Sequence, residues 1–91
     1  MLREDVELVK RSVLKKLFHF KKIGGSHTAI FNLWGGLPDN LTRNKKGQKI
    51  IKEAIDELIK SEFLLSKPST GEIHVSINPR KIKEVKELLG L

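Results

Sequence analysis

The feature that most restricts the fold of this chain is one β-hairpin signal near its C-terminal end. Apolar and polar residues alternate over 73–77, as in a half-buried strand. An apolar run at 63–65 precedes it as a second short strand, and 67–72 between them has the composition of a turn. Because a lone two-stranded hairpin is not stable in water, it must pack against helices. The 91 residues suit one such domain, which we expect to span 1–91.

Apolar spacings of three and four predict a helix on each side of this region. The first, at about 4–22, carries an apolar stripe, and Gly24-Gly25 is expected to end it because glycine adopts the left-handed C-cap conformation without strain. The stripe consists of Leu2, Val6, Val9, Val13, Leu17 and Phe20. Asn78-Pro79 predicts the cap and first residue of a last helix over about 79–89.

Two further helices are expected between these. The second is a short helix over 26–34, capped by Ser26 or Thr28, with Phe31 and Trp34 in or near the core. The third spans about 44–61 after a polar connection at 39–42, and Thr42 or Asn44 can cap it. Gly47 near its start is expected to loosen the first turn.

The expected order is helix, helix, helix, hairpin, helix, a mostly α protein with a small β-hairpin. This order is the plan of a winged helix-turn-helix domain. Ile23 is expected to add a one-residue strand beside the hairpin. By alternation along its strand, His74 is expected to point away from the core and to be exposed.

The charges are unevenly distributed. The chain has 18 Lys and Arg against 11 Asp and Glu, a formal net charge of +7. Residues 10–22 and 41–52 form two basic blocks without any acidic residue. The first block is read equally well as a solvated helix face, whereas the second coincides with the start of the third expected helix.

In a helix-turn-helix domain, the first half of the later helix faces the bases, where amine, guanidinium and amide donors bind phosphates and base edges. Lysines at a helix N-terminus oppose the helix dipole, an arrangement that a bound anion would relieve. The expected DNA contacts of the third helix are Arg43, Asn44, Lys45, Lys46, Gln48, Lys49 and Lys52.

Further contacts are expected from two other segments. The hairpin at 66–73 would act as a wing along the DNA backbone, with Lys67, Ser69 and Thr70 within reach of phosphate, although a plain solvated turn fits the segment as well. His27 and Thr28 could donate to a phosphate at the start of the second helix, although a capping or packing role fits them as well.

Several classes of function are disfavoured. The chain has no cysteine, and its three histidines share no metal-ligand spacing, so no metal or other cofactor is expected. No nucleophile and base stand in a catalytic pattern, so an enzyme is not expected. No apolar run reaches the length of a membrane span and no signal peptide is visible, which favours a cytoplasmic protein.

Several segments together resemble those of small archaeal winged helix-turn-helix proteins. They are Lys22-Ile23-Gly24-Gly25 with His27-Thr28, Leu58-Ile59-Lys60-Ser61-Glu62-Phe63-Leu64, Ser66-Lys67-Pro68 and His74-Val75-Ser76-Ile77-Asn78-Pro79. The resemblance covers about residues 9–89 and implies a winged-helix fold with a double-stranded DNA-binding, transcription-regulatory role. The turn at 68–72 departs from the family pattern. The Cys-free composition rich in Lys, Ile and Glu fits a thermophile.

Two other functions remain open from the sequence. A winged-helix scaffold can serve as a protein-interaction module without binding DNA. An RNA-binding domain is also conceivable, although the lack of paired exposed aromatics disfavours single-strand stacking. The last helix, with Leu88, Leu89 and Leu91, is the expected place for a homodimer contact.

Overall fold

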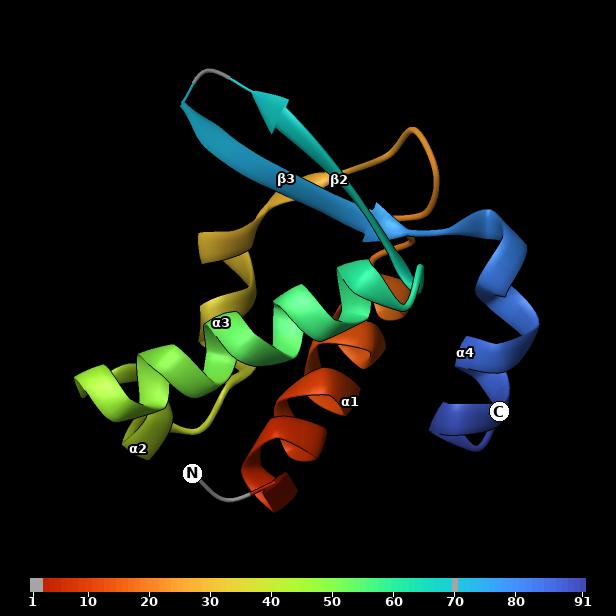
Figure 1. Cartoon of the computed structure of the whole chain (residues 1–91). Coiled ribbons are helices and arrows are strands. Elements are labelled where there is room, and N and C mark those ends of the chain that lie inside the picture. The colour runs from red at the N-terminus through yellow and green to blue at the C-terminus, as the bar shows by residue number, and fades with distance from the viewer. Residues whose placement is uncertain (1–2, 70) are drawn as a thin grey trace.

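The structure is a computed structural model, and it describes residues 3–69 and 71–91. Leu2 and Thr70 therefore lie outside the described residues. The chain is mostly helical with a small three-stranded antiparallel sheet (Figure 1). Its elements in order are α1 (Arg3–His19), β1 (Thr28–Ala29), the 3₁₀ helix η1 (Ile30–Gly36), α2 (Asp39–Thr42), α3 (Lys45–Lys60), β2 (Leu64–Ser69), β3 (Glu72–Ile77), the 3₁₀ helix η2 (Pro79–Lys81) and α4 (Ile82–Leu89).

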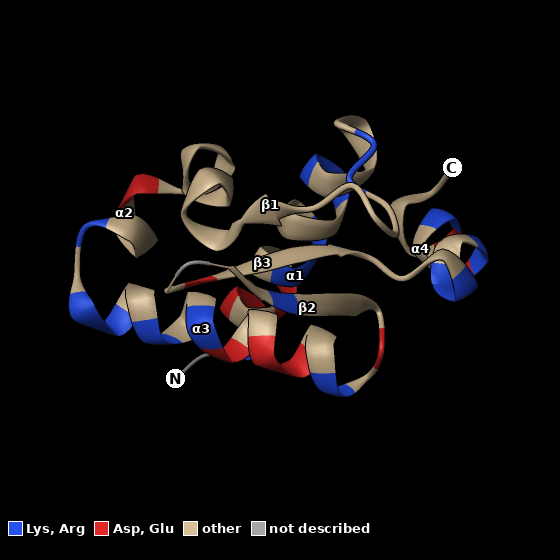
Figure 2. Cartoon of the chain, turned by 90° about the horizontal axis from the view of Figure 1, so that it is seen from above, with Lys and Arg blue, Asp and Glu red and all other residues tan. Residues whose placement is uncertain are grey.

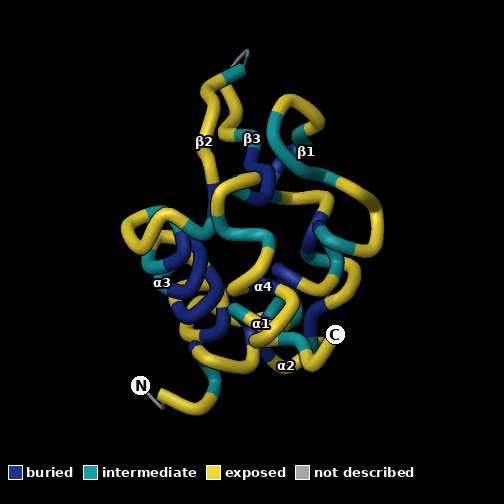
Figure 3. The backbone as a smooth tube through the Cα atoms, turned by 90° about the vertical axis from the view of Figure 1, so that its right-hand side faces the viewer, coloured by how far each residue is buried: buried dark blue, intermediate teal, exposed yellow. Residues whose placement is uncertain are grey.

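The core lies between α1, α3 and one face of the sheet, with α4 against α1 at the side (Figures 1 and 3). The predicted apolar stripe of α1 is confirmed from Val6 to Leu17, all of whose members are buried. Phe20, expected to continue the stripe, is 59% exposed because the helix has ended before it. From α3, the buried side chains are Ile50, Ile51, Ala54, Ile55 and Leu58.

The first helix ends at His19, earlier than predicted, and Gly24 is not its cap. Lys21 takes the left-handed conformation with φ 56°. The Lys22 N–H donates to the Leu17 carbonyl at 2.8 Å, and the Lys21 N–H donates to the Phe18 carbonyl at 3.1 Å. This pair of bonds is a Schellman motif, which satisfies carbonyls left open at the helix end. A lysine here occupies the position that glycine usually takes.

The sheet has the strand order β1-β3-β2, and strand β1 was not predicted. The helix predicted over 26–34 is wrong in its first half, because Thr28 and Ala29 pair with Val75 and His74 of β3. Thr28 is thus a strand residue and does not cap a helix. Ile23 does contact the sheet as expected, through a single parallel bridge to Ile77.

The connection between β1 and α3 is more helical than predicted. The residues after Ala29 form η1, and the polar stretch 39–42 forms the single helical turn α2. Phe31 was expected in the core but is 61% exposed, whereas Leu33 is buried and Trp34 is half-buried.

The hairpin is longer than predicted. Strand β2 continues to Ser69 and pairs with β3 from Leu64↔Ile77 to Ser69↔Glu72. The residues that looked like a turn over 67–69 are therefore mostly strand, and Gly71, with φ 80°, lies in the connection. Figure 3 shows that the outer half of the hairpin extends beyond the core and is mostly exposed.

The last helix begins as predicted at Asn78-Pro79. The Asn78 side chain accepts from the Arg80 N–H at 3.1 Å, and Pro79 is the first residue of η2. Val85 is buried, and Ile82 and Leu89 are half-buried against the core. Within the described residues, no helix combines the length and apolar character needed to cross a membrane.

An ion-pair network joins α1 to α3 outside the core. The Arg3 guanidinium donates to both carboxylate oxygens of Glu57, at 2.6 and 2.7 Å. The Lys10 ammonium lies 2.7 Å from the same carboxylate. The hydrogen bond from Arg3, followed by that from Lys10, lowers the pKa of Glu57 to about 2.

Candidate nucleic-acid interface

The start of α3 is fixed by two short-range features. The Asn44 Oδ1 accepts from the Gly47 N–H at 2.7 Å, which confirms the predicted N-cap. Gly47 is buried, and a Cβ there would overlap the backbone of Leu41 in α2. The expectation of a loose first turn is therefore wrong, since the missing side chain lets α2 and α3 pack in direct backbone contact.

Four lysines lie on the exposed side of this helix start. The spacing of Lys45, Lys49 and Lys52 places them in one row along the helix, and Lys46 lies on its flank. All four are exposed, and none forms a salt bridge within 3–69 and 71–91. The row therefore presents uncompensated positive charge to solvent.

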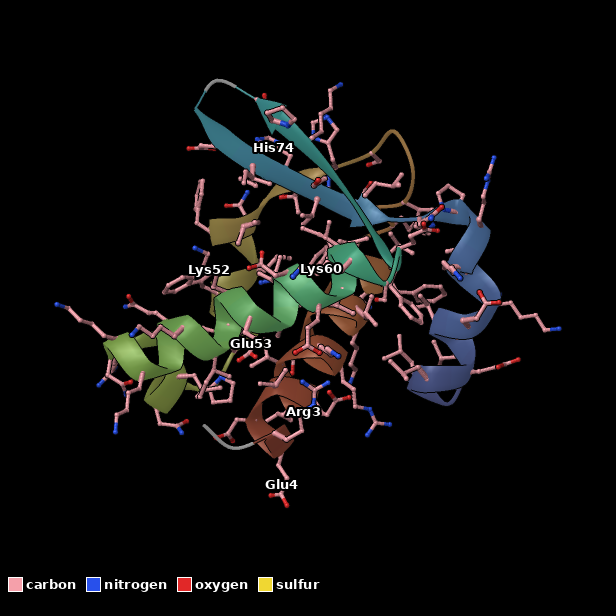
Figure 4. The ribbon with its side chains drawn as sticks, in the orientation of Figure 1. Arg3, Glu4, Lys52, Glu53, Lys60 and His74 are labelled. Carbon is pink, nitrogen blue, oxygen red and sulfur yellow. The ribbon has the colours of Figure 1, made fainter. Side chains whose placement is uncertain are left out.

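Acidic residues limit this surface to the first half of α3. Glu53, Asp56 and Glu57 follow the lysines, so the helix changes from basic to acidic along its length (Figure 2). In Figure 4, Glu53 extends from the side of α3 that is nearer α1, whereas Lys52 extends from the other side. Glu57 is bound to Arg3, as described above. The basic surface is thus confined to Lys45–Lys52.

Three of the seven predicted contacts on this helix are engaged by the fold. Asn44 uses its oxygen as the cap and donates from Nδ2 to the Asn40 carbonyl at 2.6 Å. The Gln48 amide donates to the Thr42 carbonyl at 3.2 Å. Arg43 is exposed, and its Nη2 lies 3.7 Å from the Asp39 Oδ2, so the carboxylate offsets part of the arginine's charge. These partners could not be inferred from the helical pattern.

The hairpin lies beside α3. Figures 1 and 2 both place its outer end toward the same side of the molecule as the first turns of α3, and β2 is the strand nearest α3. Lys67 is exposed on β2, and Ser69 is half-buried at the end of this strand. Thr70, the remaining predicted wing contact, is outside the described residues.

The structure separates His27 and Thr28 from the lysine row. Thr28 begins β1, the opposite edge of the sheet from β2, and His27 precedes it. The Thr28 hydroxyl accepts from the Asn32 amide at 3.0 Å. The His27 Nδ1 lies 2.8 Å from the His74 Nδ1, so one imidazole donates to the other. His74, expected to be exposed, is half-buried by this contact.

The surroundings of His27 disfavour its protonation. Partial burial is the main cause that lowers the pKa of His27, followed by the positive potential of His74, Lys67 and Lys22. Glu72 lies 3.8 Å from the His74 Nε2. Elsewhere in the described ranges, as here, no three His, Asp or Glu side chains form a group that could hold a metal ion.

Several residues of the first basic block, 10–22, bind other parts of the fold. Lys10 binds Glu7 and Glu57, as part of the network between α1 and α3. The Lys16 ammonium donates to the Asn32 carbonyl at 2.9 Å, and the Arg11 guanidinium donates to the Leu88 carbonyl at 3.1 Å. These three residues therefore stabilise contacts between elements of the fold.

Comparisons with known proteins add no assignment: no family model, no curated protein and no solved structure matches this chain.

Proposed function

We propose that this chain is a winged helix-turn-helix protein that binds double-stranded DNA and regulates transcription. In this proposal, α2 and α3 are the helix-turn-helix, the first half of α3 enters the major groove, and the β2–β3 hairpin is the wing beside the backbone. The observation that carries the proposal is the row of lysines at Lys45, Lys49 and Lys52, with Lys46 beside it, at the start of a helix. The charges of Lys45 and Lys46, in the first turn, oppose the helix dipole, and phosphate would offset them.

Two aspects of the fold support the same arrangement. The contact between Gly47 and Leu41 holds α2 against the start of α3, which is the rigid pairing that a helix-turn-helix needs. The strand order β1-β3-β2 leaves the β2–β3 hairpin projecting on the side of the lysine row. Lys67, exposed on β2, is then the basic side chain of the wing.

The test measures duplex affinity against salt concentration by fluorescence anisotropy. Wild-type protein is expected to show a slope of about −4, one unit for each phosphate that the four lysines neutralise. The variant Lys45→Ala/Lys46→Ala/Lys49→Ala should lose about three units of this slope. The matched control, Lys81→Ala/Lys83→Ala/Lys86→Ala, removes the same charge near α4 and should retain it.

Two results would contradict the proposal. One is a wild-type slope below about two, and the other is equal loss of affinity in the α3 variant and the α4 control. Competition with structured RNA separates the RNA alternative, because the narrow major groove of A-form RNA excludes a helix. Selection from random duplexes would then show whether binding is sequence-specific, as regulation of transcription requires.

A further inference from the structure

A groove between α1 and α4 is not used by the proposed DNA contact. It has a volume of about 620 Å³, and Figures 1 and 2 place α4 at the opposite side of the molecule from the first turns of α3. Its lining combines basic with apolar side chains and includes no acidic residue. The basic side chains include Arg11, Lys15 and Lys21, and the apolar ones are Phe18, Leu89 and Leu91. A partner that fits this groove brings negative charge together with an apolar group.

The chain itself carries such a pair of groups on the same helix. Glu4 and Leu8 are one helical turn apart, and Arg11 and Lys15 continue the same exposed stripe of α1. The Leu8 side chain is 48% exposed. In Figure 4, Glu4 extends away from the body of the molecule, and it forms no salt bridge with any described residue. The stripe is thus acidic and apolar at one end and basic at the other.

We propose that this stripe is the interface of a homodimer in which two α1 helices pack antiparallel about a two-fold axis. Reversal of the second helix places its acidic end against the basic end of the first, and the two contacts are identical by symmetry. Leu8 of each copy then lies against Arg11 of the other copy, at the edge of that copy's groove. Glu4 of each copy approaches Lys15 of the other.

Local features of α1 permit this packing. The axis then falls between Leu8 and Arg11, and the small side chain of Ser12 beside Arg11 leaves room for the partner helix. The hydrogen bond from Arg11 to the Leu88 carbonyl draws that charge toward α4 and away from the axis. The sequence predicted a dimer through the last helix, whereas here α4 supplies only a wall of the groove. This dimer does not depend on DNA binding, because its contacts lie on α1 and its test contains no nucleic acid.

The test is sedimentation equilibrium of the full chain over a range of concentrations. Wild-type protein is expected to dimerise. Glu4→Lys and Lys15→Glu each place like charges at both symmetric contacts, and each should weaken dimerisation at least about tenfold. An equimolar mixture of the two variants should dimerise again, because opposite charges then meet at both contacts. Glu84→Lys is the matched control, an exposed acid in the first turn of α4, and should leave the dimer unchanged.

Leu8→Gln provides a second test that leaves every charge in place. Its side chain is half-exposed, so the variant should fold like wild type, as checked by circular dichroism, and dimerise more weakly. A wild-type chain that stays monomeric overturns the proposal. So does a dimer that resists Glu4→Lys, Lys15→Glu and Leu8→Gln, or one that only Glu84→Lys weakens. Failure of the mixture to dimerise, with both variants folded, overturns the antiparallel arrangement.

Discussion

The backbone of Gly47 in α3 lies against the backbone of Leu41 in α2, with no room for a side chain between them. Gly47→Ala should therefore destabilise the protein by about 1–3 kcal/mol, since its methyl group must push the two helices apart. Urea denaturation measures this change. Gly25→Ala is the control, because no atom beyond the adjacent residues lies within 4 Å of an added Cβ, and it should stay within about 0.5 kcal/mol of wild type. Equal stability of both variants would contradict the close approach.

Asn44 is expected to act through the helix cap and not through a base contact. Asn44→Ala should cost about 1 kcal/mol, because the Gly47 N–H loses its acceptor, and Asn44→Ser should recover most of that loss. Thermal denaturation measures both variants, and duplex affinity is measured beside it. If Asn44→Ser restores stability but not DNA affinity, the amide contacts a base after all.

Glu62 follows α3 in the left-handed conformation, with φ 67°. Glu62→Gly should stabilise the protein by about 0.5–1 kcal/mol, since the strain of about 1–2 kcal/mol that it removes exceeds the added chain entropy. Lys60→Gly, still within α3, should instead destabilise by about 1 kcal/mol. Chemical denaturation measures the free energy of unfolding of both variants. A loss of stability in Glu62→Gly as well as in Lys60→Gly would argue against strain at Glu62.

The ion pairs of Glu57 predict a loss of stability in acid. Because its pKa is lowered from 4.5 to about 2 in the folded chain, its contribution is complete above pH 4.5 and disappears as the pH falls toward 2. Glu57→Gln should flatten the dependence of the melting temperature on pH over this window, and Glu84→Gln, which removes an exposed carboxylate outside this network, is the control. An unaltered profile for Glu57→Gln would show that Arg3 and Lys10 do not hold this carboxylate in solution.

The histidine pair predicts a second pH dependence, at higher pH. The pKa of His27 is lowered from its ordinary value of 6.5, so its contribution to stability is complete above pH 6.5 and declines as the pH falls through the lower, folded value. His27→Gln should reduce this decline. NMR titration of the imidazole protons gives the pKa directly, and a value at or above 6.5 would refute the prediction.

The long periodic helices of this fold could be predicted from local sequence. The apolar stripe, the Asn44 cap and the loop that follows placed α3 within a residue of its bounds, and Asn78-Pro79 placed the start of the last helical segment. Prediction failed where the secondary structure depends on a partner that is distant in the sequence. Thr28 and Ala29 form a strand only because β3 lies beside them, and no periodicity marks a two-residue strand.

The candidate site divides in the same way. Helical spacing alone places Lys45, Lys49 and Lys52 on one exposed row. The contact between His27 and His74 spans 47 residues, so it becomes visible only when the sheet is known. Cross-strand register is the signal that could have found it, but that register requires knowing that Ala29 pairs with His74.

The pairing of Ile23 and β1 with β3 has a consequence for the order of folding. Strand β2 is close to β3 in sequence, so the hairpin closes rapidly. Strand β1 pairs with β3 only after a much longer loop closes, because α3 lies between them in the sequence. During synthesis, the segment that follows α1 leaves the ribosome long before Val75 and Ile77 do. The sheet edge formed by Ile23 and β1 is therefore among the last parts of the nascent chain to become ordered. Until then this segment is accessible to chaperones and proteases.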